Sequence, residues 1–154
     1  YPEEPIIVTE ELQGEVFKYT FDSFKSKMIC GTKDTWLTEE NNDHTAVKVC
    51  ALNLWIQKWC EAHPDHHIYG VYTGYGFYVF DVYYDKQWIS FENLCFLNRC
   101  DSLWEHSLDY HWVPILYCGP FDEKALSEIH QPIVVKPMQE RGDYAGNRVV
   151  IKPN

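Results

Sequence analysis

Several features that would assign this chain to a common class are missing from its sequence. No apolar run approaches the roughly 18 residues that a membrane-spanning helix needs. No basic amino-terminal stretch is followed by an apolar segment, as in a secretory signal. Internal repeats and low-complexity stretches are also absent. We therefore expect a soluble, non-secreted protein with no membrane partner.

Basic residues are scarce. The chain has 13 Lys and Arg against 23 Asp and Glu, which gives a formal net charge of −10. Attraction to phosphate supplies most non-specific affinity for nucleic acids, and this net charge opposes it. The sequence therefore excludes a broad basic surface, and any contact with nucleic acid must be local.

The cysteines lack the tightly spaced ligand pairs of a typical zinc site. Cys60 and His63 form one close pair, but Cys95 and Cys100 follow much later and are spaced too widely. Buried, reduced thiols are the favoured interpretation, which indicates a cytoplasmic or other intracellular location. A zinc site built from these four residues stays open as the alternative.

The length and composition predict one domain. The chain has 154 residues, of which 45% are hydrophobic, enough for a single substantial core. The sequence starts at Tyr1 and not at methionine, which indicates a processed, recombinant or excised segment of a larger chain. We expect residues 1–154 to form one domain.

The spacing of apolar residues and the positions of turn residues predict an α+β fold, with an antiparallel β-sheet core and a few flanking helices. The predicted strands cover residues 5–12, 15–21, 27–30, two segments within 68–84, 112–118, 132–136 and 148–152. The predicted helices cover residues 44–63, 91–99 and 123–129, with Asp43, Ser90 and Asp122 as their N-caps.

Three local predictions go further. The first two strands meet at Gly14, which predicts a hairpin that brings Glu10, Glu11 and Glu15 close together. The aromatic stretch over 68–84 should lie at the centre of the sheet. The last two strands should form a closing hairpin.

Four stretches follow one another along the chain: VTEELQG (residues 8–14), IYGVYTGYGFYVFDV (68–82), WVPILYCGPFDEKAL (112–126) and PIVVKPMQERGDYAGNRVVIKPN (132–154). In this order, they resemble the motifs of phage-type RNA ligases. These ligases belong to the lysine-adenylating nucleotidyltransferase superfamily, which also contains DNA ligases and mRNA capping enzymes. The resemblance covers nearly the whole chain and implies the ATP-grasp-like adenylation core of that superfamily, with ATP and Mg²⁺ as its cofactors.

The residue that carries the family's chemistry is replaced. Such ligases transfer AMP from ATP to a lysine within the motif Glu-Lys-Leu-x-Gly, and this reaction needs a neutral, nucleophilic amine. Here Glu10 and Gly14 match the motif, but Glu11 stands at the lysine position. A carboxylate there would repel the triphosphate, and Glu10 and Glu15 would add to the repulsion. The alternative is that these glutamates form a solvated face of the first hairpin.

Other family positions have changed as well. Val71 stands where the family has a glutamate that contacts ribose, and Gln131 with Pro132 replaces a Glu-Gly pair. Lys33 stands where an arginine is expected. Several unrelated losses indicate relaxed catalytic demand.

Some nucleotide-binding positions are retained. The resemblance implies that Phe80, or Tyr78 two residues earlier, stacks on adenine, and that Lys136 and Lys152 contact phosphate. With Glu10, Gly14 and Gln131, these residues form the predicted nucleotide site. Core packing of the two rings and plain solvent exposure of the two lysines are the alternatives.

Three histidines in one loop suggest a separate site. His63, His66 and His67 could bind a metal ion or titrate near neutral pH. They also follow a predicted helix end, where histidine interacts favourably with the helix dipole. We favour the second interpretation and predict no metal site.

The leading hypothesis is a catalytically inactive ligase-like module that binds a protein partner, or binds nucleotide or RNA weakly. For this module we assign no definite cofactor, and we expect ATP and Mg²⁺ to bind only if the pocket still functions. A second hypothesis is an active ATP-dependent RNA ligase in which Lys18 or Lys136 supplies the amine. A third is nucleic-acid binding without chemistry, with an affinity that falls steeply with salt.

Overall fold

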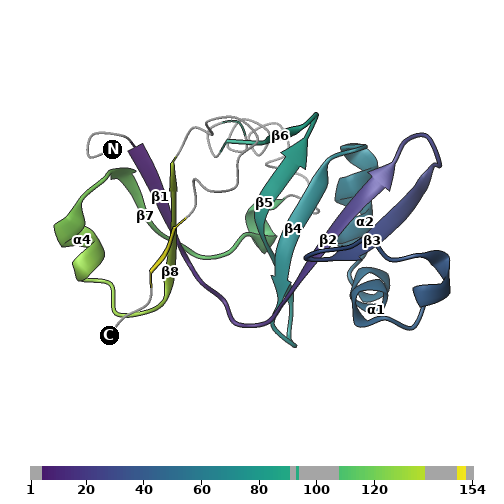
Figure 1. Cartoon of the computed structure of the whole chain (residues 1–154), viewed down its shortest axis with the longest axis horizontal. Coiled ribbons are helices and arrows are strands. Elements are labelled where there is room, and N and C mark those ends of the chain that lie inside the picture. Colours follow the sequence, from purple (N-terminus) through teal and green to yellow (C-terminus); the bar gives the residue numbers. More distant parts are fainter. Residues whose placement is uncertain (1–4, 91–92, 94–107, 138–148, 152–154) are drawn as a thin grey trace.

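The computed structural model describes residues 5–90, 93, 108–137 and 149–151. Their strands form a four-stranded sheet in the order β7-β1-β8-β9 and a five-stranded sheet in the order β3-β2-β4-β5-β6. We call these sheet A and sheet B. All pairings between named strands are antiparallel. The two sheets lie side by side, with α4 next to sheet A and with α1 and α2 at the opposite end (Figure 1). The predicted α+β class is confirmed.

The strands are β1 Pro5–Glu10, β2 Glu15–Asp22, β3 Lys27–Thr32, β4 His67–Tyr72, β5 Phe77–Tyr84, β6 Gln87–Trp88, β7 Ile115–Pro120, β8 Ile133–Pro137 and β9 Val149–Ile151. The helices are α1 Thr45–Leu52, α2 Leu54–Ala62 and α4 Glu123–Ser127, with 3₁₀ turns η1 Glu39–Asn41 and η2 Leu108–His111.

The larger core lies between sheet B and the helices. Successive strand residues point to opposite faces, so Phe17 and Tyr19 of β2 face the helices together with Ile68 of β4. Ile56 and Trp59 of α2 fill the other side, and both are fully buried. The Tyr19 hydroxyl donates a hydrogen bond of 2.7 Å to the carbonyl of Ala46 and so fixes α1 to the sheet.

Sheet A has a smaller core. Ile6 and Val8 of β1 pack with Ile133 and Val135 of β8, covered by Leu126 and other side chains from the α4 region. The opposite face of the sheet is also buried, since Ile7, Thr9 and Lys136 are hardly exposed. That second face meets sheet B.

The predicted hairpin over residues 5–12 and 15–21 is wrong. β1 pairs with β7 and β8, whereas β2 pairs with β3 and β4, so the two strands belong to different sheets. Gly14 lies in the connection between the sheets. The predicted closing hairpin is confirmed, because β8 pairs with β9.

The helix predictions need two corrections. The continuous helix over 44–63 is interrupted at Asn53, whose backbone (φ −120°, ψ 85°) is not helical. Its N-cap is His44 and not Asp43, because the His44 side chain accepts a hydrogen bond from the Ala46 amide. Asp122 is confirmed as the N-cap of α4.

Two further predictions have mixed outcomes. The strand predicted over 112–118 starts later, at Ile115. The stretch over 68–84 supplies β4 and β5 in the middle of sheet B, as expected. Ser90 accepts a hydrogen bond from the Asn93 amide. The rest of the predicted helix over 91–99 lies outside the described residues, as do Cys95, Cys100 and Lys152.

Candidate functional site

Glu10 and Glu11 lie where β1 leaves sheet A. The Glu10 amide donates to the carbonyl of Pro114 at 2.9 Å, and the Glu11 amide donates to the carbonyl of Pro132 at 3.0 Å. Glu11 is therefore held beside the segment of Gln131 and Pro132, which precedes β8. The fold thus brings together two positions at which the sequence departs from the ligase motifs.

The Glu11 carboxylate has an unsatisfied oxygen. Its Oε2 is buried and accepts no hydrogen bond from any residue that the structure describes. A buried acceptor without a donor is costly, more so when it carries charge. This oxygen favours a cation or a hydrogen-bond donor as its neighbour and disfavours a phosphate.

Gly14 occupies a position that only glycine fits. A Cβ atom there would lie 2.1 Å from the carbonyl oxygen of Tyr72, far inside van der Waals contact. The connection between the sheets therefore passes directly against β4. This close approach is a structural reason for Gly14 that is independent of any nucleotide.

Lys136 joins the two sheets. Its Nζ lies 3.1 Å from Oδ1 of Asp81 and donates a second hydrogen bond of 3.3 Å to the carbonyl of Phe80. The side chains of Lys136 and Asp81 are only 4% and 3% exposed. The Trp112 ring lies 5.7 Å from Nζ. A lysine that the resemblance assigns to phosphate is thus engaged by an internal carboxylate.

A bulge in β5 makes this contact possible. The register between β4 and β5 shifts opposite Phe80, so Val79 and Val82, three positions apart, both pack in the helix-side core. Asp81 is thereby free to meet Lys136 on the other face. Tyr78 and Phe80 are half-buried and belong to neither core cluster.

Lys18 is a second buried amine, on β2. It is 7% exposed, and its Nζ lies 4.4 Å from the centre of the Trp36 ring and 5.9 Å from that of Tyr69. Its stem covers Gly31, where a Cβ atom would lie 2.7 Å from Lys18 Cε. In the described part of the chain, Lys18 has no carboxylate within ion-pair distance. Burial lowers the pKa of Lys18, and the more distant charge of Asp34 opposes this shift in part.

Lys18 lies on the same face of sheet B as Asp81. The register aligns Lys18 with Tyr69 of β4 and Tyr69 with Asp81 of β5, so the three residues form one row across the sheet. Two strand spacings separate the row's ends, or about 10 Å. The two lysines therefore differ sharply: Lys136 is ion-paired, and Lys18 is enclosed by aromatic rings.

His63 and His66 stack on aromatic rings, and His67 meets the Trp36 ring edge-on. The His63 ring stacks on Trp59, and its Nδ1 lies 2.9 Å from the Trp59 carbonyl at the end of α2, as the helix-end interpretation requires. His66 stacks on Tyr84 with ring centres 3.9 Å apart. Burial lowers the pKa of both His66 and His67. In the described ranges, no group of three metal-binding side chains occurs.

The remaining predicted positions are less informative. Val71 is buried on β4, and Lys33 is exposed in the loop after β3. Cys60 is fully buried, which raises the pKa of its thiol and keeps it protonated. Sequence reasoning missed Asp81 as a site residue, although an acidic residue inside an apolar strand signals a buried cation nearby.

Comparison with known proteins identifies the fold. No protein-family profile matches the sequence, and no curated protein matches it significantly. Solved structures of an RNA ligase from Naegleria gruberi do match. One variant without ligand is 17% identical with a TM-score of 0.76, and it covers 99% of this chain and 50% of the ligase.

Two liganded variants of the same ligase give similar values. A complex with AMP and manganese is 16% identical with a TM-score of 0.75, and a complex with ATP and manganese is 18% identical with a TM-score of 0.74. Each covers 99% of this chain and 51% of the ligase. This chain therefore has an RNA ligase-like fold and spans about half the length of the ligase it matches. Within the described residues, no helix is long and apolar enough to cross a membrane.

Proposed function

We propose that this RNA ligase-like domain is a degenerate relative of the phage-type enzymes that does not form an adenylated lysine and works as an intracellular binding module. Its main ligand is a protein partner, with at most weak residual binding of nucleotide or RNA. The observation that carries the proposal is Glu11, whose buried Oε2 has no donor among the described residues, at the position where the ligase motif has its nucleophilic lysine.

The state of Lys136 supports the proposal. A phosphate that approached this lysine would have to displace Asp81, whose carboxylate already lies 3.1 Å from Nζ in a nearly water-free setting. Separating such a pair costs several kcal/mol, on the order of 3 to 5. With the Glu11 amide bonded to the Pro132 carbonyl and Val71 in place of an acid, the positions that the ligase resemblance assigns to the nucleotide do not fit ATP and a divalent metal.

Intact-mass measurement tests the proposal directly. The chain is incubated with ATP and either Mg²⁺ or Mn²⁺, alongside the variant Glu11→Lys. We expect no gain of one AMP in either protein, because the variant keeps the Lys136–Asp81 pair and the changed positions 71 and 131. A gain of AMP by the unmodified chain would overturn the proposal. A gain of AMP by Glu11→Lys alone would show that the other changed positions do not prevent adenylation, and would overturn the interpretation of several unrelated losses.

A second candidate function is an active ATP-dependent RNA ligase with Lys18 as nucleophile. The specific observation is the buried amine, whose lowered pKa favours the neutral form that can attack the α-phosphorus. A phosphorus–nitrogen bond would form, the bond to pyrophosphate would break, and the amine proton would leave to solvent. Lys136 is a poorer candidate because its amine is held by Asp81.

Site mapping separates the two candidates. An AMP adduct found by peptide mass spectrometry on Lys18, absent from Lys18→Met and increasing as pH rises, would establish the ligase. If the labelled peptide carried another lysine, the Lys18 candidate would fail.

A further inference from the structure

A groove runs along the outer edge of sheet B, at the strand farthest from the contact with sheet A. It has a volume of about 740 Å³ and lies between β3, the segment over 36–42 and the start of α1. β3 is an edge strand, and β5, which holds Asp81, is three strands away. The groove is therefore separate from the positions that the ligase resemblance assigns.

The groove borders backbone groups of β3 that have no hydrogen-bond partner in the part of the chain that the structure describes. The carbonyl of Cys30 accepts from the Leu37 amide, and the Thr32 amide donates to Thr35, so both residues turn their polar backbone groups away from β2. The N–H and C=O groups of successive residues point to alternate sides of a strand, so those of Met28 also point away from β2. The pairing of Met28 with Phe21 is consistent with this, because the Phe21 carbonyl accepts a hydrogen bond from the Asp65 amide and so points away from β3.

After Leu37 the chain diverges from β3 toward η1. Within the described residues, this leaves the N–H and C=O of Met28 and the N–H of Cys30 without a hydrogen bond. Unpaired groups on an edge strand are a template for an added strand. The open edge is short and lies inside the groove, not on a flat surface.

The side chains of the groove lie on both faces of β3. Met28, Cys30, Leu37 and Val47 form a wall on the helix side. Ile29, Thr20, Trp36 and His67 form a wall on the opposite side. Side chains of an extended peptide also alternate between two sides. A peptide paired with Met28 would therefore place one apolar side chain against the first wall and its two neighbours against the second.

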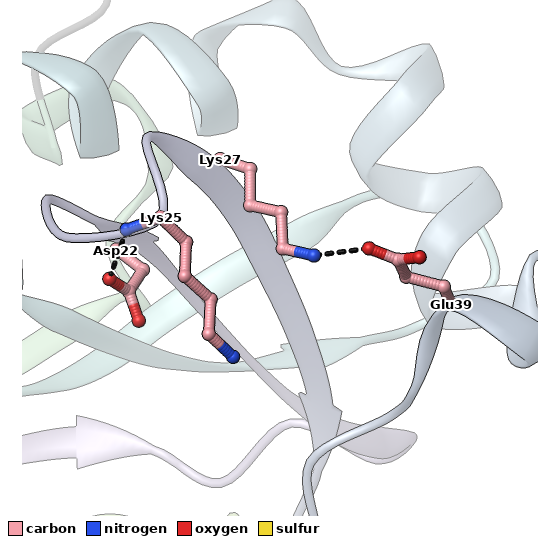
Figure 2. Close-up of polar contacts among 4 residues, drawn as sticks. All are labelled: Asp22, Lys25, Lys27 and Glu39. Atoms are coloured by element: carbon pink, nitrogen blue, oxygen red, sulfur yellow. Dashed lines mark hydrogen bonds and ion pairs between the residues drawn. The ribbon is translucent and has the colours of Figure 1, made fainter.

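Charges at one end of the groove favour an acidic peptide. Figure 2 shows Lys25 and Lys27 at the end where β3 begins, with Lys27 joined to Glu39 and with the Lys25 amide joined to Asp22. The ammonium group of Lys25 has no partner in the described part of the chain. The two lysines at this end are accompanied by Asp22 and Glu39, so the ammonium group of Lys25 is the site that can pair with a carboxylate of the peptide.

We propose that the β3 groove binds an extended segment of a partner protein that adds antiparallel to β3, with three consecutive apolar residues followed by acidic ones. The antiparallel direction places the acidic residues beside Lys25. This inference rests on the proposed function as a binding module and names the partner's chemistry. A second copy of this chain fits less well, because two chains that each carry −10 repel one another.

Fluorescence anisotropy with a labelled peptide tests the groove. The probe has the sequence Thr-Val-Leu-Val-Asp-Asp, and two control peptides carry either an N-methyl group on leucine or lysines in place of the aspartates. We expect saturable binding of the probe, about five- to tenfold weaker binding of the N-methyl peptide because it cannot donate to Met28, and weaker binding of the lysine peptide.

Three variants of the chain complete the test. Met28→Pro removes the outward N–H without breaking a bond to β2, and we expect it to weaken probe binding about five- to tenfold relative to Met28→Ala, which keeps the N–H. Lys25→Glu should weaken binding of the probe and strengthen binding of the lysine peptide. Circular dichroism shows whether each variant is folded. If Met28→Pro does not fold, the two control peptides measured on the unmodified chain still test the proposal.

The outcomes are distinct. Equal binding of the probe and the N-methyl peptide, or no binding of the probe at millimolar concentration, would overturn the groove proposal. A dimer in sedimentation experiments that Met28→Pro dissociates would also overturn it, in favour of a second copy. AMP transfer by the unmodified chain would overturn the proposed function instead, whatever the peptides do.

Discussion

Lys136 and Asp81 come from different sheets, and each is the other's buried counter-charge. Removing the Asp81 carboxylate leaves the buried Lys136 ammonium with the Phe80 carbonyl as its hydrogen-bond acceptor among the described residues. We expect Asp81→Asn to lower the free energy of unfolding by about 3 to 5 kcal/mol. The double variant Asp81→Leu with Lys136→Met removes both charges and should cost much less. Urea unfolding of the three proteins measures this, and a loss below about 1 kcal/mol for Asp81→Asn would contradict the role of the pair.

Gly14 offers a second test at the residue scale. The Cβ atom of Gly14→Ala would lie 2.1 Å from the Tyr72 carbonyl oxygen, so the backbone must move, and we expect a loss of more than about 2 kcal/mol. Gly74→Ala is the matched control. Gly74 has φ +97° and open space around it, so the control should cost only the backbone strain of about 1 to 2 kcal/mol. Thermal unfolding compares the two, and equal losses would show that the close approach has no energetic weight.

Among the elements, the connection from α2 to β4 should make stability depend on pH. Burial lowers the pKa of His66 and His67 from 6.5, so the unfolded chain takes up protons at a higher pH than the folded chain. The free energy of unfolding should therefore fall as pH drops from about 7 to about 5. His66→Gln should flatten this slope. Chemical unfolding at several pH values checks the sign, and an opposite slope would contradict it.

The elements also show what local sequence patterns can predict. The central strands and the Asp122 cap are predictable because their signals lie within a few residues, and the closing hairpin because its two β-branched runs follow one another along the chain. The break at Asn53 was not, because buried residues continue at helical spacing on both sides, from Val49 and Cys50 to Ile56 and Trp59. A local pattern does not record that the two helices have separate axes.

Long-range pairing explains the other errors. Gly14 is a turn signal, yet Thr9 pairs with Ile115 and Val134, more than a hundred residues away. The Lys136–Asp81 contact joins residues 55 positions apart, and an acidic residue in an apolar strand signals a buried cation without identifying which one. The sequence located Glu11, Gln131 and Lys136 as positions of interest. Their environments depend on how the two sheets meet, which the sequence pattern does not specify.

For the whole molecule, the two cores predict unequal stability. In the described residues, the sheet B core has fourteen buried members and the sheet A core has four. Larger buried clusters resist local opening more strongly. Native-state hydrogen exchange should show the protected amides of β1 and β8 opening with a free energy lower by at least about 1.4 kcal/mol, or tenfold in rate, than those of β2 and β4. Uniform protection across both sheets would show that they open as one unit.

The chain path through the two sheets has a consequence for synthesis. Strands β2 to β6 are contiguous and can assemble as they emerge, but β1 comes before them and, among the described strands, pairs with β7 and β8. At roughly 5–20 residues per second, the hundred-residue gap corresponds to a wait of about 5 to 20 s. During translation, β1 therefore stays unpaired, with Ile6, Ile7 and Val8 uncovered, until β7 and β8 have been synthesised.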